Sequence, residues 1–454
     1  MATIIQRKDH YCVVYNFTDE NGNRKQKWET FKTHAEAKKR RKEVEYHQEL
    51  GTFVVPKCKT MKDLLKEYVN LYGKNTWALS TYQGNIALIN NYISPTIGEM
   101  KLLDINTRVI EKYYQKLLKT KAVGAVAFGK RTEKTKFVTA QTVREIHKIL
   151  RSCFAQAVKW DVMEKNPCIN ATLPKTEHKQ REIWNADTLF KAMEVCNDER
   201  LKLAINLAFS CSLRIGEMLG LTWDCVDVTR ESIENGTTHI FIDKEIQRVN
   251  RSVLDTLNNK DVMTIFPAVS SKTRTLQIMK TPKTVSSIRK VYLPKTVAEM
   301  LIDWKKKQDK SREILGDEYQ DYNLVFASAL GMPLDGTAIR TSMRKLIKEN
   351  NLPPVVFHSL RHSSITYKLK LNGGDIKSVQ GDSGHSQAQM VTDQYSHILD
   401  EDRVHNAQLF QNAFYDNKSQ KPVAAKPDDA SQELLSKVLQ NPELVALLQA
   451  LTNK

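Results

Sequence analysis

The sequence predicts a multidomain α+β protein. Its expected parts are a small three-stranded sheet with one helix, an all-helical region, and a mainly helical region with a small antiparallel sheet. Three observations predict this class. The chain has 454 residues, enough for two or three domains. Strand-like segments occupy its beginning, and helical periodicity dominates from about residue 60. The predicted boundaries are 1–55, 58–175, 176–415 and 416–454.

The first region carries the strand signals. Residues 3–8 and 11–17 are rich in β-branched and aromatic residues, and an Asn-Gly turn follows at Asn21-Gly22. A third strand is expected over 24–31, where basic residues alternate with aromatic ones. A helix rich in Lys and Arg should then run from 34 to about 50. So few residues make a binding module, not an enzyme.

The second region has helical spacing throughout. A first helix begins at Met61, another runs over about 80–93, and Asn106 caps a third. A long helix is expected over 139–160, and the following Asn-Pro pair prevents its continuation. The basic stretch 120–137 is interpreted as a loop.

The third region combines helices with two short strand-like segments, 238–242 and 290–293. After it, residues 417–429 are rich in Lys, Pro, Ala and Asp, as in flexible linkers. Two short amphipathic helices are expected at 431–440 and 442–451. Their apolar faces favour docking, either on the same chain or on a neighbouring protomer.

Composition limits the classes of partner and the cellular location that the protein can have. The net charge is +17 and the pI is about 9.3, which favours a polyanionic partner, nucleic acid first. The seven cysteines form no CxxC pair, and no signal peptide or stretch of about 18 apolar residues is seen. We therefore expect reduced thiols, no membrane contact and a cytoplasmic location.

Three motifs carry the chemistry. They are Leu-Arg-Ile-Gly-Glu from residue 213, His-Ser-Leu-Arg-His from residue 358, and Gly-His-Ser from residue 384 with Asp-Gln-Tyr from residue 393. In the last motif the tyrosine follows the histidine by ten residues. Arginine forks hold phosphate oxygens, histidines exchange protons, and a tyrosine phenol can attack phosphorus once a base and a positive field activate it. This set suffices to cleave a phosphodiester without a metal or a nucleotide cofactor. The candidates are Arg214, His358, Arg361, His385 and Tyr395.

The leaving 5′-oxygen needs an acid, for which Lys283 is the candidate and Lys280 the rival. Glu217 is expected to orient Arg214. Neighbouring residues of the same types compete for the other roles: Tyr367 and Tyr415 with the tyrosine, His362 and His397 with the histidines.

These motifs, in this order, resemble those of the tyrosine recombinases, the phage integrase family, and the resemblance covers roughly residues 1–415. It implies an arm-type DNA-binding domain, a core-binding helical domain and a catalytic domain that forms a 3′-phosphotyrosyl intermediate. It also implies a homotetramer on core-type and arm-type DNA sites, integrating or excising a mobile element at the nucleoid of a bacterial host. An excisionase or a host DNA-bending protein is a further expected partner.

The basic residues of the first two regions are candidates for DNA contacts, with a solvated surface as the alternative. In the first region they are Arg7, Lys8, Arg24, Lys25 and Lys27. In the second they are Lys119, Lys121, Lys130, Arg131, Lys134 and Lys136.

Two departures from the family pattern stand out. Residues 250–275 are longer than the usual hairpin, which loosens the register of Lys283, and Ser383 stands where the family more often has an apolar residue. Two alternatives remain open, a DNA-binding regulator on the same fold and a type IB topoisomerase. Trapping on a suicide substrate separates the first from a recombinase, and supercoil relaxation without strand exchange would favour the second.

Overall fold

A computed structural model describes residues 2–18, 24–49, 59–127, 130–132, 136–176, 182–268, 270, 273–395, 407–408 and 411. The side chains of 18, 43, 47, 125–127, 130–132 and 393–395 are not described. Residues 1–388 form one compact unit and 389–454 another. The helices expected at 431–440 and 442–451 lie outside the described residues.

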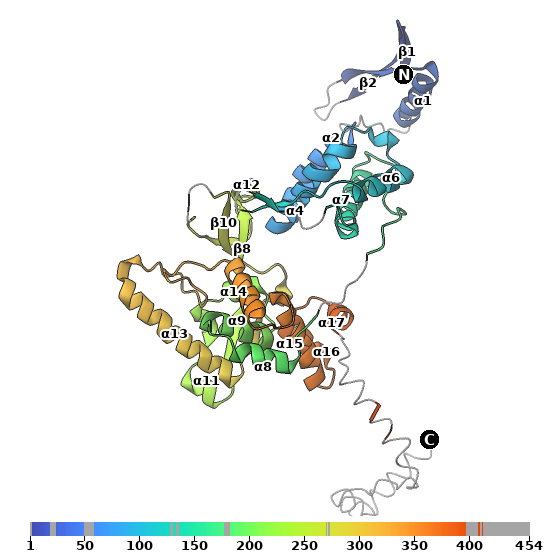
Figure 1. Ribbon diagram of the computed structural model, residues 1–454. Helices are drawn as coiled ribbons and strands as arrows, with labels where there is room; N and C mark the ends of the chain where they lie inside the picture. Colours follow the sequence, from blue (N-terminus) through green and yellow to red (C-terminus); the bar gives the residue numbers. More distant parts are fainter. Residues whose placement is uncertain are drawn as a thin grey trace, which may run out of the picture. The chain divides into compact units, whose positions relative to one another are not determined.

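The first region is an antiparallel sheet in the order β1-β2-β3, covered on one face by α1 (Figure 1). Thr33 and Glu36 cap the helix reciprocally, backbone to side chain, at 3.3 Å each. Val13 and Tyr15 meet Ala37 and Val44 in its small core. The elements are β1 (Thr3–Arg7), β2 (His10–Thr18), β3 (Arg24–Phe31) and α1 (His34–Glu49).

The second region is helical, as the sequence predicts, and three of its helices begin with a side-chain N-cap. The Thr60 side chain accepts from the Asp63 amide, and Asn106 and Thr139 cap later helices in the same way. The elements are α2 (Met61–Glu67), α3 (Lys74–Thr76), α4 (Leu79–Leu88), α5 (Ser94–Ile97), α6 (Thr107–Leu118) and α7 (Ala140–Lys159), joined by η1 (Tyr68–Gly73), η2 (Ile89–Ile93) and η3 (Leu102–Asp104).

The loop interpretation of 120–137 is wrong in part. Strands β4 (Ala125–Ala127) and β5 (Lys130–Thr132) pair as an antiparallel hairpin, with Val126 opposite Arg131. The two strands, Ala-Val-Ala and Lys-Arg-Thr, are only three residues long and show no polar–apolar alternation, so the sequence carried no strand signal here.

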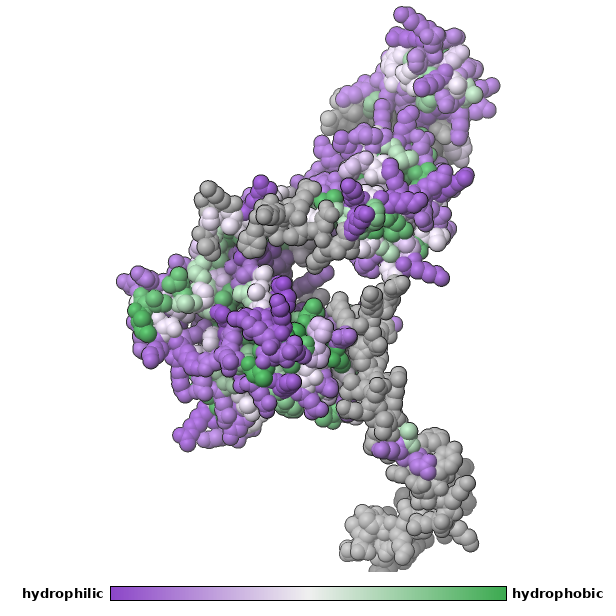
Figure 2. All heavy atoms as spheres, viewed as in Figure 1, coloured by the Kyte–Doolittle hydropathy of each residue, from purple (hydrophilic) through white to green (hydrophobic). Residues whose placement is uncertain are grey.

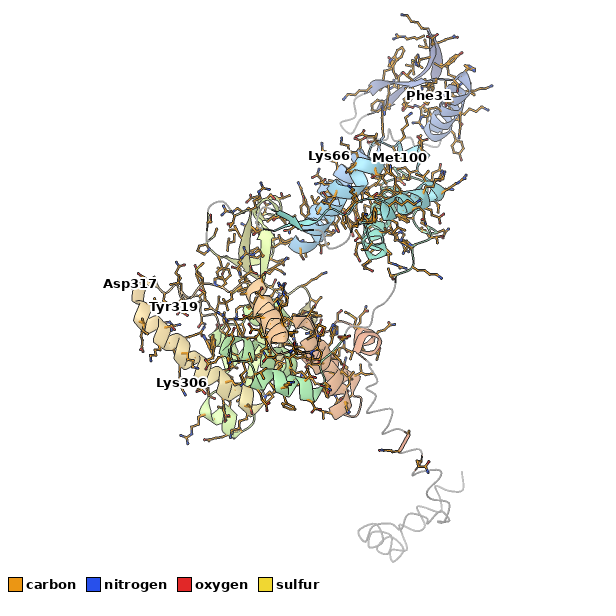
Figure 3. The ribbon with its side chains drawn as sticks, viewed as in Figure 1. Phe31, Lys66, Met100, Lys306, Asp317 and Tyr319 are labelled. Atoms are coloured by element: carbon orange, nitrogen blue, oxygen red, sulfur yellow. The ribbon has the colours of Figure 1, made fainter. Side chains whose placement is uncertain are left out.

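The third region contains most of the helices. They are α8 (Ala186–Glu194), α9 (Glu199–Ser210), α10 (Ile215–Leu219), α11 (Arg230–Glu234), α13 (Lys295–Leu315), α14 (Gly336–Glu349), α15 (Phe357–Leu371), α16 (Ile376–Ser383) and α17 (Ala388–Tyr395), with turns η4 (Trp223–Cys225), η5 (Val285–Ser287) and η6 (Gly316–Glu318). Tyr319 lies beyond the end of α13 (Figure 3). Arg312 of α13 lies over its ring. The fold class expected from the sequence is confirmed.

Two small antiparallel sheets accompany these helices. One has the order β11-β7-β6, formed by β6 (Val226–Asp227), β7 (His239–Ile242) and β11 (Arg289–Tyr292). The other has the order β8-β10-β9, formed by β8 (Glu245–Asn250), β9 (Val262–Ile265) and β10 (Thr275–Lys280). The sequence predicted the first sheet and missed the second.

The long segment 250–275 accounts for part of the second sheet. It forms α12 (Arg251–Thr256) and β9, and Val253, Leu254 and Leu257 are buried in the same apolar core as α2 to α7. The Gln83 side chain also accepts a hydrogen bond from the Asn250 amide at 3.0 Å. This insertion therefore joins the helical region to the third region through a shared core.

Candidate active site

Arg214 stands at the N-cap of α10. Glu217, 2% exposed, accepts hydrogen bonds from the Arg214 amide at 3.1 Å and from its Nη1 at 2.5 Å. Gly220, three residues after Glu217, is needed for packing, because a Cβ there would lie 2.8 Å from the Cα of Glu245 on β8. The orienting role predicted for Glu217 agrees with these contacts.

Glu217 also binds a second arginine. Arg289 Nη2 donates at 3.1 Å to Glu217 Oε2, the oxygen that also accepts from the Arg214 amide, and only 8% of Arg289 is exposed. Burial alone would raise the pKa of Glu217, but the charges of Arg289 and Arg214 outweigh it and lower that pKa. Sequence reasoning assigned no role to Arg289, although it ends a Ser-Ser-x-Arg stretch typical of the family.

Arg361 lies on α15 and is 1% exposed. Its Nη1 donates to the Ser212 carbonyl, and its Nη2 to the Ser383 carbonyl at 2.7 Å. His358, one turn earlier on the same helix, is exposed, and its ring packs edge-on against that of His362 at 4.8 Å. The two residues therefore differ in exposure: His358 is exposed, whereas the carbonyls keep Arg361 inside.

The C-terminal end of α16 gathers the three arginines. The carbonyls of Asp382, Ser383 and Gly384 accept, respectively, from Arg289 Nε at 2.7 Å, Arg361 Nη2 at 2.7 Å and Arg214 Nη2 at 3.4 Å. The last carbonyls of a helix lack intrahelical donors and carry a partial negative charge, so cations bind there. We call residues 382–385 the arginine loop.

Gly384 makes the arginine loop possible. It has a φ of +66°, the left-handed conformation that ends many helices. A Cβ at this position would also lie 2.8 Å from Arg289 Nη1. Both constraints explain why glycine precedes His385.

His385 is 4% exposed and follows directly in this loop. Its Nε2 lies 3.1 Å from Arg361 Nη2, and its Nδ1 lies 2.7 Å from Ser383 Oγ. Burial, and then the charges of Arg361, Arg214 and Arg289, lower the pKa of His385 to about 3. The ring is therefore neutral near neutral pH.

The two candidate lysines differ in their surroundings. Lys280, on β10, is 6% exposed and donates to Glu245 at 2.8 Å and to the Thr281 carbonyl at 2.9 Å. Lys283 is exposed, between β10 and η5. Only Lys283 can move toward a bound molecule without breaking a buried ion pair.

The candidate nucleophile is placed only in part. The backbone of Tyr395 ends α17, but its side chain lies outside the described atoms. The rival Tyr367 accepts a hydrogen bond from the Ala186 amide at 2.8 Å and packs edge-on against Phe209, a structural role. Tyr415 and His397 lie outside the described residues.

The candidate DNA contacts of the first region fall on two faces of its sheet. Arg7 lies over the exposed Trp28 ring at 4.8 Å, and alternation along β3 places Arg24 on the face of Trp28. Lys25 and Lys27 alternate onto the other face, the one covered by α1. Lys8 lies in the β1–β2 turn with a φ of +46°. Hydrophilic residues predominate over this region (Figure 2).

In the helical region, Lys119, Lys121 and Lys136 are exposed, and Lys136 lies 5.6 Å from the centre of the Phe137 ring. Three further candidates are not described well enough to place. Lys130 and Arg131 are described only as backbone of β5, and Lys134 lies outside the described residues.

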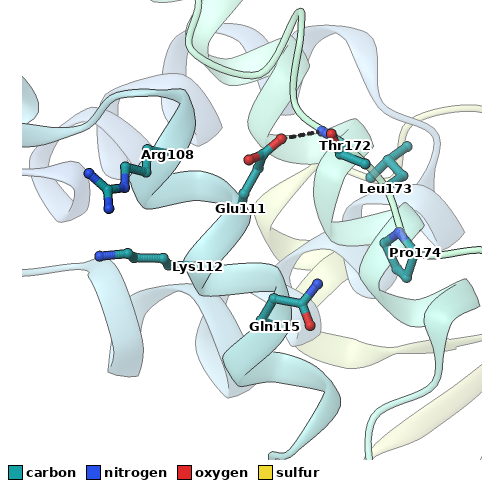
Figure 4. A pocket seen from close by; sticks show the side chains of 7 residues that line it. All are labelled: Arg108, Glu111, Lys112, Gln115, Thr172, Leu173 and Pro174. Atoms are coloured by element: carbon teal, nitrogen blue, oxygen red, sulfur yellow. Dashed lines mark hydrogen bonds between the residues drawn. The ribbon is translucent and has the colours of Figure 1, made fainter.

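A surface cavity of about 530 Å³ lies elsewhere, beside α6, and contains none of the candidates. Arg108 and Lys112 line it, and Glu111 accepts from the Thr172 amide at 2.8 Å (Figure 4). Within the described ranges, no group of three His, Cys, Asp or Glu side chains could hold a metal ion. No helix in the part of the chain that the structure describes is both long and apolar enough to cross a membrane.

Comparison with known proteins identifies the chain. Residues 184–402 match the phage integrase family, and residues 60–118 match the phage integrase N-terminal SAM-like domain. A XerC-like tyrosine recombinase of Caldanaerobacter subterraneus is 26% identical, over 90% of this chain and 97% of the relative. The ICEBs1 integrase of Bacillus subtilis is 23% identical, over 77% of each chain.

The fold has a solved counterpart. The Tn1549 transposon integrase, in complex with a circular intermediate DNA, aligns with a TM-score of 0.57 and 16% identity, over 77% of this chain and 99% of that one. This likeness is one of fold. The two family matches and the tyrosine recombinase relatives lead to one conclusion: the chain belongs to the phage integrase family, the tyrosine-type site-specific recombinases.

Proposed function

We propose that this recombinase cleaves DNA with Tyr395 and that Arg214, Arg361 and His385 form the phosphate-binding part of its active site. The observation that carries the proposal is the arginine loop, where one helix end brings together both arginines and the histidine. Residues 214, 361 and 385 are far apart in sequence, and a purely structural ion cluster would not need a neutral histidine among them.

In the proposed reaction the Tyr395 oxygen attacks phosphorus, and the bond from phosphorus to the 5′-oxygen breaks. The phenolic proton leaves to a base, for which the exposed His358 is the candidate, and the 5′-oxygen takes a proton from an acid. The diester energy is kept in the phosphotyrosyl bond, so a second 5′-hydroxyl can reverse the step. Fixed positive charge stabilises the oxygens of the five-coordinate transition state.

Arg214 is the arginine best placed to meet the phosphate first. Its side chain is 35% exposed, and its 3.4 Å contacts with Ser287 and Gly384 are long for hydrogen bonds. Glu217 holds the other side of the guanidinium. Arg361 is deeper, and we infer that it exchanges a carbonyl partner for a phosphate oxygen when DNA binds.

The surroundings of the two lysines support Lys283 as the acid. Lys280 neutralises Glu245 inside the protein, and moving it would leave a carboxylate without its partner. Lys283 carries no such cost. The second sheet, which the longer segment 250–275 helps to build, leaves Lys283 in the segment that directly follows β10.

We further propose that the substrate is double-stranded DNA with core-type and arm-type sites and that the reaction integrates or excises a mobile element. Exchange between two duplexes needs four strand cleavages, which a homotetramer supplies. The names of the ICEBs1 and Tn1549 relatives favour an integrative or conjugative element. An excisionase or a host DNA-bending protein would set the direction, and the reaction would take place at the nucleoid in the bacterial cytoplasm.

The nucleophile is tested with Tyr395→Phe on a nicked suicide substrate, from which cleavage releases a short strand and traps the adduct. Covalent adduct should vanish, while mobility-shift affinity stays within about threefold, because affinity comes from phosphate contacts spread over a large basic surface. Tyr367→Phe is the matched control and should still form adduct. An adduct that persists in Tyr395→Phe and disappears in Tyr367→Phe would overturn the assignment.

A further inference from the structure

Ser383, in the arginine loop, lies where the family more often has an apolar residue. It is fully buried, and its hydroxyl lies 2.7 Å from His385 Nδ1 and 3.3 Å from the Gln380 carbonyl. Its own carbonyl accepts from Arg361. One residue thus touches both the buried arginine and the histidine of the proposed site.

Arg361, His385, Ser383 and the Gln380 carbonyl form a chain of hydrogen bonds. The chemistry of donors and acceptors determines where its protons lie. A guanidinium can only donate, so Arg361 Nη2 donates and His385 Nε2 accepts. In a neutral imidazole the other nitrogen then carries the proton, so Nδ1 donates to Ser383 Oγ. The Ser383 hydroxyl proton is directed to the Gln380 carbonyl, which accepts it. Every donor in this hydrogen-bond chain, from Arg361 to the Gln380 carbonyl, has an acceptor.

The opposite tautomer would break the hydrogen bond between Arg361 and His385. A proton on Nε2 would face Arg361 Nη2, donor against donor, and protonating both nitrogens would do the same. The charged groups around the ring are Arg361, Arg214 and Arg289, with Glu217 as the nearby carboxylate. Three positive charges against one negative charge disfavour a second proton on the ring.

We propose that Ser383 is a positioning residue that holds His385 in its Nδ1–H tautomer, so that Nε2 orients Arg361 for the phosphate. This inference rests on the function proposed for His385 and Arg361. It predicts that an apolar residue at position 383 would suit a family member whose histidine finds its proton partner elsewhere, and would not suit this chain.

The test is a double-mutant cycle on the full-length protein, measuring single-turnover cleavage of the nicked suicide substrate. Ser383→Ala should slow cleavage about tenfold, the effect of about one hydrogen bond. Ser383→Thr keeps the hydroxyl and should stay within about threefold of the wild type. In a His385→Gln background, where an amide oxygen can accept from Arg361 without tautomers, adding Ser383→Ala should change the rate by less than about twofold.

A merely structural role for Ser383 gives a different result. The loss would then be equal in both backgrounds, and that outcome would overturn the proposal, as would no loss in either. The imidazole nitrogens can also be read directly by NMR on protein labelled with ¹⁵N-histidine, with His385→Gln identifying the signal. The wild type should show Nδ1–H alone, and Ser383→Ala should show a mixture with Nε2–H, because Arg361 alone then disfavours the second tautomer. An unchanged tautomer in Ser383→Ala contradicts the proposal even if His385→Gln is too slow to assay.

Failure of this inference is distinguishable from failure of the proposed function. Tyr395→Phe reports only on the nucleophile. If that variant loses the adduct while the Ser383 variants cleave normally, the positioning role alone is wrong. If Tyr395→Phe keeps the adduct, the proposed function itself is wrong, whatever the Ser383 variants do.

Discussion

Several charged residues are buried and paired in the third region, whereas others are exposed on the N-terminal sheet. In the third region, Glu217, Arg289 and Arg361 are each at most 8% exposed, and each is bonded to a named partner. On the sheet, Arg24 is exposed to solvent. Burying a charge is costly unless it is paired, so buried charges have one geometry, whereas exposed charges are screened and act collectively. The fixed geometry of the buried set suits a phosphate-binding site, and the exposed charges of the sheet suit affinity.

The two lysines near β10 are the sharpest contrast between a buried and an exposed cation. Lys283→Ala should slow cleavage about a hundredfold or more, the effect of losing a general acid, without changing the melting temperature. Lys280→Ala should instead destabilise the fold, because Glu245 loses its partner. Cleavage rates and thermal unfolding measure the two effects.

A substrate with sulfur in place of the 5′-bridging oxygen adds a control, because a thiolate leaves without an acid. It should restore the rate of Lys283→Ala. If it restores Lys280→Ala and leaves Lys283→Ala slow, the two roles are reversed.

The buried carboxylate gives the next largest effect. Glu217→Gln should lower the free energy of unfolding by about 3 kcal/mol, because the buried Arg289 and the partly exposed Arg214 both lose their anionic partner. On α13, Lys306→Gln removes an exposed ion pair with Asp303 and should change it by less than about 0.5 kcal/mol (Figure 3). Chemical denaturation of both variants would show the difference, and equal losses would remove the proposed contrast.

His385 makes stability depend on pH. Its pKa is about 3 when folded and roughly 6.5 when unfolded, so below pH 6.5 the unfolded state binds more protons and stability falls. Between pH 7.5 and 5.5 this residue should remove about 1.4 kcal/mol. The same measurement on His385→Gln should show a shallower decline by that amount. If the two proteins lose the same free energy of unfolding over this pH range, His385 is not held neutral in the native state.

A single exposed cation should have the smallest effect. If Arg24 contacts a phosphate on the Trp28 face, Arg24→Gln should lower the slope of log affinity against log salt by about 0.9. Lys39, exposed on α1, is the matched control and should leave the slope unchanged. Titrations of a duplex carrying the arm-type site would compare them. A larger change for Lys39→Gln would place the DNA on the helix side.

Several expectations about the first two regions follow from local rules. The strand over 24–31, the helix from 34, the cap at Asn106 and the long helix over 139–160 agree with the structure, because turn, cap and helix preferences depend on neighbouring residues. The second sheet and α12 were missed, because their burial depends on a core shared with α4, some 170 residues earlier. The division into domains at 55, 175 and 415 stays a prediction.

For the site, residue chemistry together with a motif order that resembles the family's named Arg214, His358, Arg361, His385 and Tyr395 as candidates. Only the tertiary structure decided that Arg361 is buried behind the loop and that Lys280 is bound to Glu245. It also showed that Ser383 bonds His385. Burial and hydrogen-bond direction arise where segments distant in sequence meet, and no local pattern records them.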